Sequence, residues 1–528
     1  MKPVLLTALA PLLLAAMGGI ARAESCEDLA KAAPAGATIT AVKAMKAGDP
    51  QEIGAFGAPP LPAATAYCRV DATLTPTPSS SIKVEVWLPP QGAWNGKFLA
   101  SGNGGFGGTL GGPRLTMRVA VRRGYATAGT DLGHTEDGAS GEMAAWALHQ
   151  PEKIADFGHR ANHLTAEFAK LMIRRYYGAA PKHAYFQGCS DGGREALMEV
   201  QRYPGDYDGV IAGAPANAWS HLMIAFAHDW NASHDASGQI IPDAKLAAIE
   251  AAALKECDAG DGLKDGLISD PRQCRFEPSH LLCQGADTAD CLTSAQATAL
   301  KAIYDGPRDA AGKVLFPGFP VGADPSPIGW PLWITGAKGQ QGSFARSFFG
   351  DFVYDDAAWK VEGADLGKAL AAAKARMGPV IDSDNPDLAA FAARGGKLIL
   401  YHGWMDAAIT PYSTVQYYEA VKRKMGAAQA ERFTRLFMVP GMAHCLAGPG
   451  PNSFDVLTAL ETWTEQGKAP EQMVASKYAN DLATFLDMPA GKALRTRPLC
   501  AYPKQARFSG TGSPDDAANW RCEAPAKS

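Results

Sequence analysis

Residues 183–193 read HAYFQGCSDGG, and this stretch decides the fold. HAYFQ at 183–187 predicts a short β-strand, and the residues after the glycines, 194–202, predict a helix. Between them lies Gly188-Cys189-Ser190-Asp191-Gly192-Gly193, which fits the pattern G-x-S-x-G. Between a strand and a helix, such a turn is strained and exposes its serine hydroxyl at the carboxyl edge of the sheet. Ser190 is therefore a candidate nucleophile. The alternative is an ordinary loop that contains a serine.

Strands and helices alternate on both sides of this turn. Further strands are expected at 82–88, 97–100, 125–130, 207–212, 397–401 and 433–439, and further helices at 155–177 and 412–424. Such alternation produces a mostly parallel sheet covered by helices, so we predict an α/β fold of the α/β-hydrolase type. The alternation stops in residues 216–379, which hold four of the ten cysteines. We therefore predict a catalytic domain at 24–215 and 380–528, interrupted by a lid domain at 216–379. The tail after Pro489 is expected to be irregular.

A serine hydroxyl is a weak nucleophile and needs a base. In this fold an acid and then a histidine follow the serine in chain order, each on a loop after a strand. His444, in PGMAHC after the strand at 433–439, and Asp406, after KLILY, meet these conditions. We predict the triad Ser190, Asp406 and His444. His402 is a rival base, but it precedes the acid and lies close to its own strand. His134 is expected to be a structural or pocket residue, and a structural loop histidine is the alternative for His444.

An oxyanion formed at the serine needs N–H donors. The backbone N–H of Asp191 is one candidate, because the residue after the nucleophile supplies a donor in this fold. The glycine-rich segment at 102–108 is expected to supply the other, from Gly105 or Gly104. A flexible turn is the alternative reading of this segment. A phosphate-binding loop is disfavoured because no G-K-[S/T] follows it.

The first 23 residues are typical of a signal peptide. Lys2 precedes a mostly apolar run, and Ala21-Arg22-Ala23 fits the small-x-small cleavage rule. A membrane anchor is the weaker alternative, because the run contains Pro11 and two glycines. We expect an exported protein, periplasmic or extracellular. The formal net charge of −4 gives no reason to expect nucleic acid or an anionic membrane as partner.

The ten cysteines are an even number, which in an exported chain indicates disulfides. Spacing alone suggests the local pairs Cys257–Cys274, Cys283–Cys291 and Cys500–Cys522. Cys189 precedes the candidate nucleophile and Cys445 follows the candidate base, so these two cysteines become neighbours if the triad forms. The absence of a C-x-x-C pair disfavours a zinc site built on thiolates.

GCSDGG, Asp406 and PGMAHC, in this order, resemble the tannase and feruloyl esterase family. This family includes feruloyl esterases, tannases and bacterial mono(2-hydroxyethyl) terephthalate hydrolases. The resemblance extends from about Cys26 to Cys522. The family's pattern implies five disulfides that use every cysteine: Cys26–Cys68, Cys189–Cys445, Cys257–Cys274, Cys283–Cys291 and Cys500–Cys522.

Cys257-Asp-Ala-Gly-Asp-Gly-Leu-Lys-Asp-Gly-Leu-Ile268 is the second group of residues with chemical interest. Ca²⁺ binds several oxygens at flexible distances, including backbone carbonyls in tight turns. The spacing is not that of an EF-hand, and a solvated acidic turn is an equally good reading of the residues alone. The resemblance implies a structural calcium ion in the lid, away from Ser190. Its ligands would be the side chains of Asp258, Asp261 and Asp265 and the carbonyls of Leu263 and Leu267.

An aromatic-rich stretch of the predicted lid is expected to contact the substrate, although plain lid core is the alternative for most of it. Trp333, Arg346 and Phe352 are the substrate-binding candidates. The other aromatic residues of the stretch are Trp330, Phe344, Phe348 and Phe349. The terephthalate-hydrolysing members hold a substrate carboxylate with an arginine, whereas the corresponding segment here, 338–341, reads KGQQ. Arg346 lies nearby in sequence but matches a different position.

These observations predict a secreted serine ester hydrolase that acts on a small ester of an aromatic acid, in the manner of a feruloyl esterase. Tannase or mono(2-hydroxyethyl) terephthalate hydrolase activity is the alternative within the enzyme class. A catalytically inactive, exported binding protein is the alternative outside it. No organic cofactor is expected, and the sequence specifies no oligomeric state.

Overall fold

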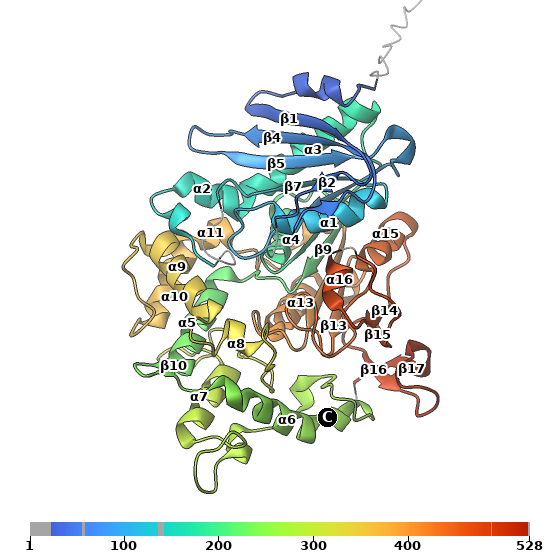
Figure 1. Ribbon diagram of the computed structural model, residues 1–528. Coiled ribbons are helices and arrows are strands. Elements are labelled where there is room, and N and C mark those ends of the chain that lie inside the picture. The colour runs from blue at the N-terminus through green and yellow to red at the C-terminus, as the bar shows by residue number, and fades with distance from the viewer. Residues whose placement is uncertain (1–22, 55–58, 136–141, 487, 526–528) are drawn as a thin grey trace, which may run out of the picture.

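The computed structural model describes residues 23–54, 59–135, 142–486 and 488–525. In this part of the chain, nine strands form one sheet in the order β1-β4-β5-β7-β6-β8-β9-β12-β13 (Figure 1). The predicted signal peptide, at 1–23, lies outside the described residues except for Ala23. Strand bounds are β1 Ala37–Met45, β4 Tyr67–Leu74, β5 Ile82–Leu88, β6 Lys97–Ser101, β7 Ala126–Thr130, β8 His183–Cys189, β9 Gly209–Gly213, β12 Lys397–Gly403 and β13 Thr434–Val439.

The sheet has two parts that differ in strand direction. β1, β4, β5 and β7 run antiparallel to one another, whereas the strands from β7 through β6, β8, β9, β12 and β13 are parallel. The central strands are buried along their whole length, as in β7 and β9, because helices cover both faces. The predicted α/β-hydrolase fold is confirmed. The predicted triad follows the carboxyl ends of the parallel strands.

Helices pack on both faces of the sheet. On one face α3, α4 and α13 contribute Phe168, Leu197 and Tyr418 to the main core, and on the other α15 contributes Leu460 to a second core. α1 packs against β6 and β7. The helix bounds are α1 Gly111–Arg122, α2 Pro151–Ala155, α3 Ala161–Tyr177, α4 Asp191–Arg202, α12 Ala389–Ala393, α13 Pro411–Met425, α14 Ala427–Ala430 and α15 Val456–Gln466.

The chain between β9 and β12 leaves the sheet and forms a mostly helical unit, in green and yellow in Figure 1. Part of it has its own core, which includes Ile249, Leu300 and Trp330. Its aromatic residues near α9 instead join the main core below the sheet. The helices are α5 Trp219–Ser233, α6 Leu246–Cys257, α7 Ser294–Asp305, α8 Trp330–Trp333, α9 Gln340–Ser347, α10 Leu366–Arg376 and α11 Gly378–Ile381; two short strands, β10 His234–Asp235 and β11 Gly238–Gln239, pair with each other.

The tail after Pro489 is more regular than expected. Its strand β15 pairs with β14, and β16 pairs with β17, where the Cys500–Cys522 disulfide connects the two hairpins. The expectation of an irregular tail was wrong because both strands are short and neither has a continuous apolar run: β15 reads RTRPLC, and β16, QARF, is only half-buried. The remaining bounds are β2 Pro50–Gln51, β3 Leu61–Pro62, β14 Gln472–Lys477, α16 Asp481–Phe485, β15 Arg495–Cys500, β16 Gln505–Phe508 and β17 Trp520–Glu523.

All ten cysteines form disulfides, in the five pairs given by the sequence analysis. Within the described ranges, none of the helices has the length and apolar character needed to cross a bilayer.

Candidate active site

Ser190 sits in a sharp turn between β8 and α4. Its backbone has φ 65° and ψ −123°, a conformation that costs a non-glycine residue free energy and is typical of strained functional turns. Glycines around it allow the close approach. A Cβ on Gly188 would lie 2.3 Å from the Gly192 carbonyl oxygen, and one on Gly193 would lie 2.4 Å from that of Gly213. The glycines of the motif are therefore a steric requirement of this turn.

The structure brings Ser190, His444 and Asp406 into one hydrogen-bonded chain. His444 Nε2 lies 2.9 Å from Ser190 Oγ, and His444 Nδ1 lies 2.7 Å from Asp406 Oδ2. Asp406 follows β12 and His444 follows β13, so the parallel strands place both loops beside the turn after β8. The side chain of His444 is 14% exposed, whereas that of Asp406 is fully buried. This arrangement can transfer a proton from the serine to the imidazole.

Asp406 is held as a carboxylate. Burial acts to raise its pKa, but the charge of His444 and the hydrogen bonds from His402 and His444 outweigh burial and place the pKa well below its usual range. Its other oxygen, Oδ1, accepts hydrogen bonds from the N–H groups of Ala408 at 2.8 Å and Ile409 at 2.9 Å. The acid is therefore ionised and fixed in orientation.

The two rival histidines have other positions. His402 is completely buried, and its Nε2 lies 3.0 Å from Asp406 Oδ2. His134 Nε2 lies 2.8 Å from the Phe106 carbonyl oxygen, and its ring stacks on Trp146. Burial lowers the pKa of His134 to about 4, so it is neutral at neutral pH. His134 therefore has the contacts of a structural histidine.

The glycine segment lies directly against the nucleophile turn. Gly192 N–H donates to the Asn103 carbonyl at 2.9 Å, and Asn103 Nδ2 donates to the Thr130 carbonyl at 2.8 Å. In the described part of the chain, neither the Asp191 N–H nor those of Gly104 and Gly105 have a hydrogen-bond acceptor. These groups are free to bind an oxyanion. We refer to residues 102–105 as the oxyanion loop.

Glu195 supports the oxyanion loop from behind and was not found from the sequence. It is 2% exposed, and its Oε2 accepts a hydrogen bond from Asn103 N–H at 3.1 Å. Burial, and then the neighbouring Asp191 carboxylate, raise the pKa of Glu195 well above its usual value. Asp191 in turn pairs with the buried Arg194 at 2.5 Å. The environment of Glu195 therefore favours its protonated form, and one carboxyl connects α4 to the oxyanion loop.

Comparison with known proteins places this site in a family. The family model described as "Tannase and feruloyl esterase" matches residues 68–523. The chain belongs to the tannase and feruloyl esterase family. It is 34% identical to the mono(2-hydroxyethyl) terephthalate hydrolase of Piscinibacter sakaiensis, with 93% of this chain and 89% of the relative covered. It is also 34% identical to a probable feruloyl esterase of Arthroderma benhamiae, over 86% of this chain and 85% of the relative.

Solved structures agree with this assignment. The crystal structure of feruloyl esterase B from Aspergillus oryzae superposes with a TM-score of 0.85 at 29% identity, covering 94% of this chain and 99% of that chain. Tannin acyl hydrolase from Aspergillus niger has the same fold, with a TM-score of 0.73 at 21% identity over 94% of each chain.

Within this family member, the Cys189–Cys445 disulfide joins the loops of nucleophile and base. The two cysteines are 256 residues apart in sequence and 6.0 Å apart between Cα atoms. Cys445 has a φ of 63°, so the chain turns sharply directly after His444. The disulfide therefore connects the residues adjacent to Ser190 and His444.

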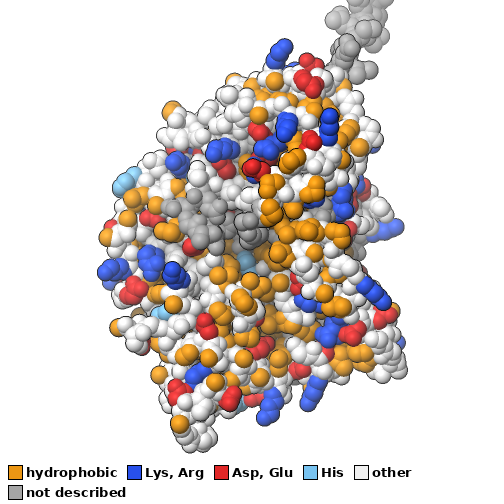
Figure 2. Space-filling view, in the orientation of Figure 1, with side chains coloured by type: hydrophobic (Ala, Val, Ile, Leu, Met, Phe, Trp, Pro, Cys, Tyr) orange, Lys and Arg blue, Asp and Glu red, His pale blue; other side chains and the backbone are white. Residues whose placement is uncertain are grey.

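Of the three substrate-binding candidates, only Trp333 lies beside the triad. The edge of its ring meets His444 at a centroid distance of 5.3 Å, and it stacks on Phe344. Phe352 is 2% exposed and packs among Phe106 and other rings as core. Arg346 is 42% exposed and lies 4.0 Å from Glu362. Figure 2 shows hydrophobic side chains gathered over the centre and lower part of this face, with charged side chains mostly at its margins.

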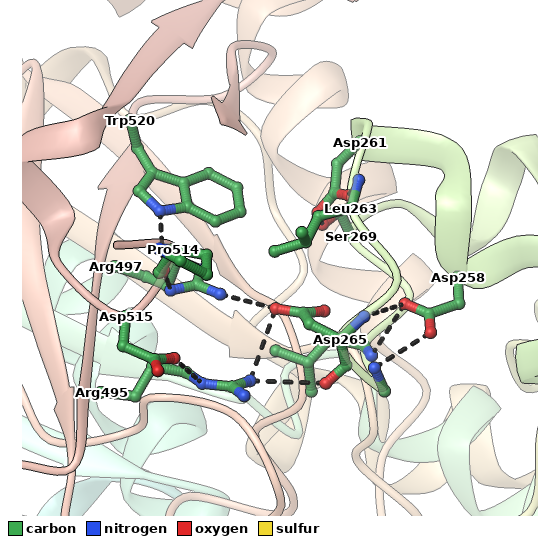
Figure 3. Close-up of polar contacts among 12 residues, drawn as sticks. Asp258, Asp261, Leu263, Asp265, Ser269, Arg495, Arg497, Pro514, Asp515 and Trp520 are labelled. Atoms are coloured by element: carbon green, nitrogen blue, oxygen red, sulfur yellow. Dashed lines mark hydrogen bonds and ion pairs between the residues drawn. The ribbon is translucent and has the colours of Figure 1, made fainter. Parts of the chain in front are cut away.

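The predicted calcium loop, residues 257–268, contacts both the C-terminal segment and the loop that carries His444. Asp265 Oδ2 pairs with Arg497 at 2.5 Å and with Arg495 at 3.4 Å (Figure 3). A Cβ on Gly441, three residues before His444, would lie 2.5 Å from Leu267 Cδ2. The loop is therefore part of the packing that supports the histidine loop.

The carboxylates of this loop make hydrogen bonds within it. Asp258 accepts the N–H groups of Asp265, Gly266 and Leu267, and Asp261 accepts the Ser269 hydroxyl at 2.5 Å (Figure 3). Asp265 Oδ1 is buried and, among the described residues, has no hydrogen-bond partner. Over the same residues, no three carboxylate side chains of this loop each place an oxygen within 4.8 Å of the others.

Proposed function

We propose that this chain is a serine carboxylic ester hydrolase for esters of aromatic acids, feruloyl-esterase-like, with Ser190 as nucleophile. The observation that carries the proposal is the 2.9 Å contact between Ser190 Oγ and His444 Nε2, in a strained turn whose neighbouring N–H groups are free. Membership of the tannase and feruloyl esterase family supports the reaction class.

In the proposed reaction His444 Nε2 takes the Ser190 proton as Oγ attacks the ester carbonyl carbon. Asp406 keeps the proton of the imidazole on Nδ1 and stabilises its positive charge. The carbonyl oxygen becomes an oxyanion and accepts hydrogen bonds from Asp191 and from Gly105 or Gly104. His444 then protonates the leaving alcohol, which leaves an acyl-enzyme on Ser190. Water, deprotonated by His444, attacks the acyl-enzyme and releases the acid.

The acyl pocket is proposed to accept a neutral aromatic acyl group, with Trp333 as one wall. Trp333 supports this because its ring lies beside His444, where an aromatic acid can stack. A relative is named as a mono(2-hydroxyethyl) terephthalate hydrolase, and that substrate carries a free carboxylate. In this chain Arg346 lies beside Glu362 and is 42% exposed, so it is a poor candidate to receive such a carboxylate. We therefore propose a preference for feruloyl or galloyl esters.

We also propose that residues 257–268 bind a structural Ca²⁺ ion. The donor chemistry fits, because three carboxylates and the carbonyls of Leu263 and Leu267 are hard oxygen ligands. The buried, unpaired Oδ1 of Asp265 supports the site. To bind the ion, Asp258 and Asp261 would have to give up their hydrogen bonds within the loop. When bound, the ion would supply structural order next to the histidine loop. Calcium should raise Tm, EDTA should lower it, and Asp261→Asn should respond to neither; identical Tm values in calcium and EDTA would rule out the site.

Export to an oxidising compartment, periplasmic or extracellular, is proposed as well. Five disulfides support it, since such bonds form and persist in those environments. N-terminal sequencing of the mature protein tests it: cleavage after Ala23 is expected, and an intact Met1 on the exported protein would contradict the predicted signal.

The reaction class is tested with initial rates on methyl ferulate, methyl gallate and mono(2-hydroxyethyl) terephthalate. Wild type should hydrolyse at least one of them and react with a fluorophosphonate probe at Ser190. Ser190→Ala should fold, lose the label and lose roughly 10⁶-fold in kcat. A folded wild-type protein that neither turns over these esters nor takes up the probe would identify a binding protein instead of an enzyme.

A further inference from the structure

His402 is completely buried at the end of β12, four residues before the catalytic acid. Its Nε2 lies 3.0 Å from Asp406 Oδ2 and also 3.0 Å from the Ile409 carbonyl oxygen. Both neighbours are acceptors, so Nε2 must carry the proton. On the other side of the ring, Nδ1 lies 2.7 Å from the Thr414 hydroxyl on α13. A neutral ring accepts a hydrogen bond there.

We propose that His402 is a positioning residue of the triad, which donates its Nε2–H to Asp406 and so holds the carboxylate toward His444. The inference rests on the proposed function. His402 lies behind the acid, where it has no access to substrate, so it cannot act as the base.

The hydrogen-bond inventory of Asp406 explains why this donor matters. Oδ1 accepts from Ala408 and Ile409, and Oδ2 accepts from His444 and His402. Two oxygens with two lone pairs each are thereby fully used in a site without solvent. Removing His402 leaves Oδ2 one donor short and also leaves the Ile409 carbonyl unpaired. The carboxylate then gains freedom to rotate away from His444.

Two amide variants provide a matched pair, because their N–H groups reach different ring positions. His402→Gln extends its amide to the place of Nε2 and can donate to Asp406. His402→Asn reaches only the place of Nδ1, beside Thr414. His402→Leu removes both, and Thr414→Val removes the hydroxyl that faces Nδ1 while it keeps the histidine.

The experiment measures kcat and KM on methyl ferulate, or on whichever of the three esters wild type turns over. The rate of fluorophosphonate labelling and Tm are measured alongside. The Leu and Asn variants should lose about 10- to 100-fold in kcat at unchanged KM, less than the roughly 10⁴-fold loss expected when an acid of this kind fails to orient its histidine. Gln should recover most of the rate.

Equal kcat values in folded Gln and Asn variants would overturn the proposal, because packing alone would then explain the residue. Wild-type rates in the Leu variant would overturn it too. If the Leu variant does not fold, the comparison of the Gln and Asn variants still tests the positioning role of His402. Failure of the proposed function gives a different result, since wild type itself would then show neither turnover nor labelling.

Discussion

Glu195→Gln tests whether the buried carboxyl behind the nucleophile holds a proton in the folded protein. The pKa of Glu195 is raised by burial and by Asp191, so the folded state retains a proton that the unfolded chain releases. Stability conferred by this proton is complete below the unfolded pKa of about 4.3 and falls as pH rises toward the folded pKa. A glutamine at this position keeps the acceptor for Asn103 N–H and carries no titrating proton.

The magnitude follows from linkage. One proton bound only in the folded state changes the free energy of unfolding by about 1.4 kcal/mol per pH unit. Between pH 6 and pH 8, wild type should therefore lose stability relative to Glu195→Gln, by at most about 2.7 kcal/mol, the limit reached when the folded state keeps the proton over the whole interval. Glu195→Ala should be destabilised by a further ~1–3 kcal/mol at every pH, because the Asn103 N–H is left buried without an acceptor.

Denaturant unfolding at pH 6, 7 and 8, followed by tryptophan fluorescence, measures these differences. Glu52→Gln is the control, since Glu52 is exposed and its variant should follow wild type. Parallel pH curves for wild type and Glu195→Gln would refute the reasoning, because Glu195 would then be ionised in the folded protein. Activity gives a second readout: Gln should retain kcat, whereas Ala should lose it as the oxyanion loop moves.

Two further predictions concern the surroundings of the triad. Replacing Cys189 and Cys445 by Ser should lower kcat at temperatures well below unfolding and cost about 2–4 kcal/mol of stability. The same change at Cys283–Cys291, in the predicted lid, should spare kcat, and parallel loss of activity and tertiary signal would contradict a positioning role for the first pair. Trp333→Ala should raise KM for methyl ferulate about 2- to 13-fold, corresponding to ~0.5–1.5 kcal/mol of aromatic stacking, and leave a small aliphatic ester unaffected. Equal effects on both esters would place Trp333 outside the acyl pocket.

The parts of this molecule that could be predicted from sequence are those that follow strand ends. Ser190, Asp406 and His444 each lie in a loop after an apolar run, and parallel strands bring such loops to one edge of the sheet. The order of serine, acid and histidine along the chain then limits which histidine can be the base. Helix α4 starts at Asp191, three residues earlier than the expected helix, because the turn itself supplies the first helical residues.

Other parts gave a weaker signal. β4 alternates between buried and half-buried residues, so its period-two pattern could have predicted a strand. In β1, several Ala and Thr residues weaken the contrast between apolar and polar positions, so the sequence gives little sign of a strand. Glu195 could not be recognised, because α4 is buried on every side and a carboxyl in its middle is expected to be exposed. Its partner, the Asn103 N–H, belongs to the glycine-rich segment. The backbone course of that segment depends on its contact with the turn at Ser190, which the sequence alone does not show.

Three features support the reacting groups from behind. Glu195 contacts the oxyanion loop, His402 contacts the acid, and the Cys189–Cys445 disulfide joins the nucleophile and base loops. Ser190 is held at a costly φ of 65°, and that strain persists only if the surrounding structure fixes the turn from several sides.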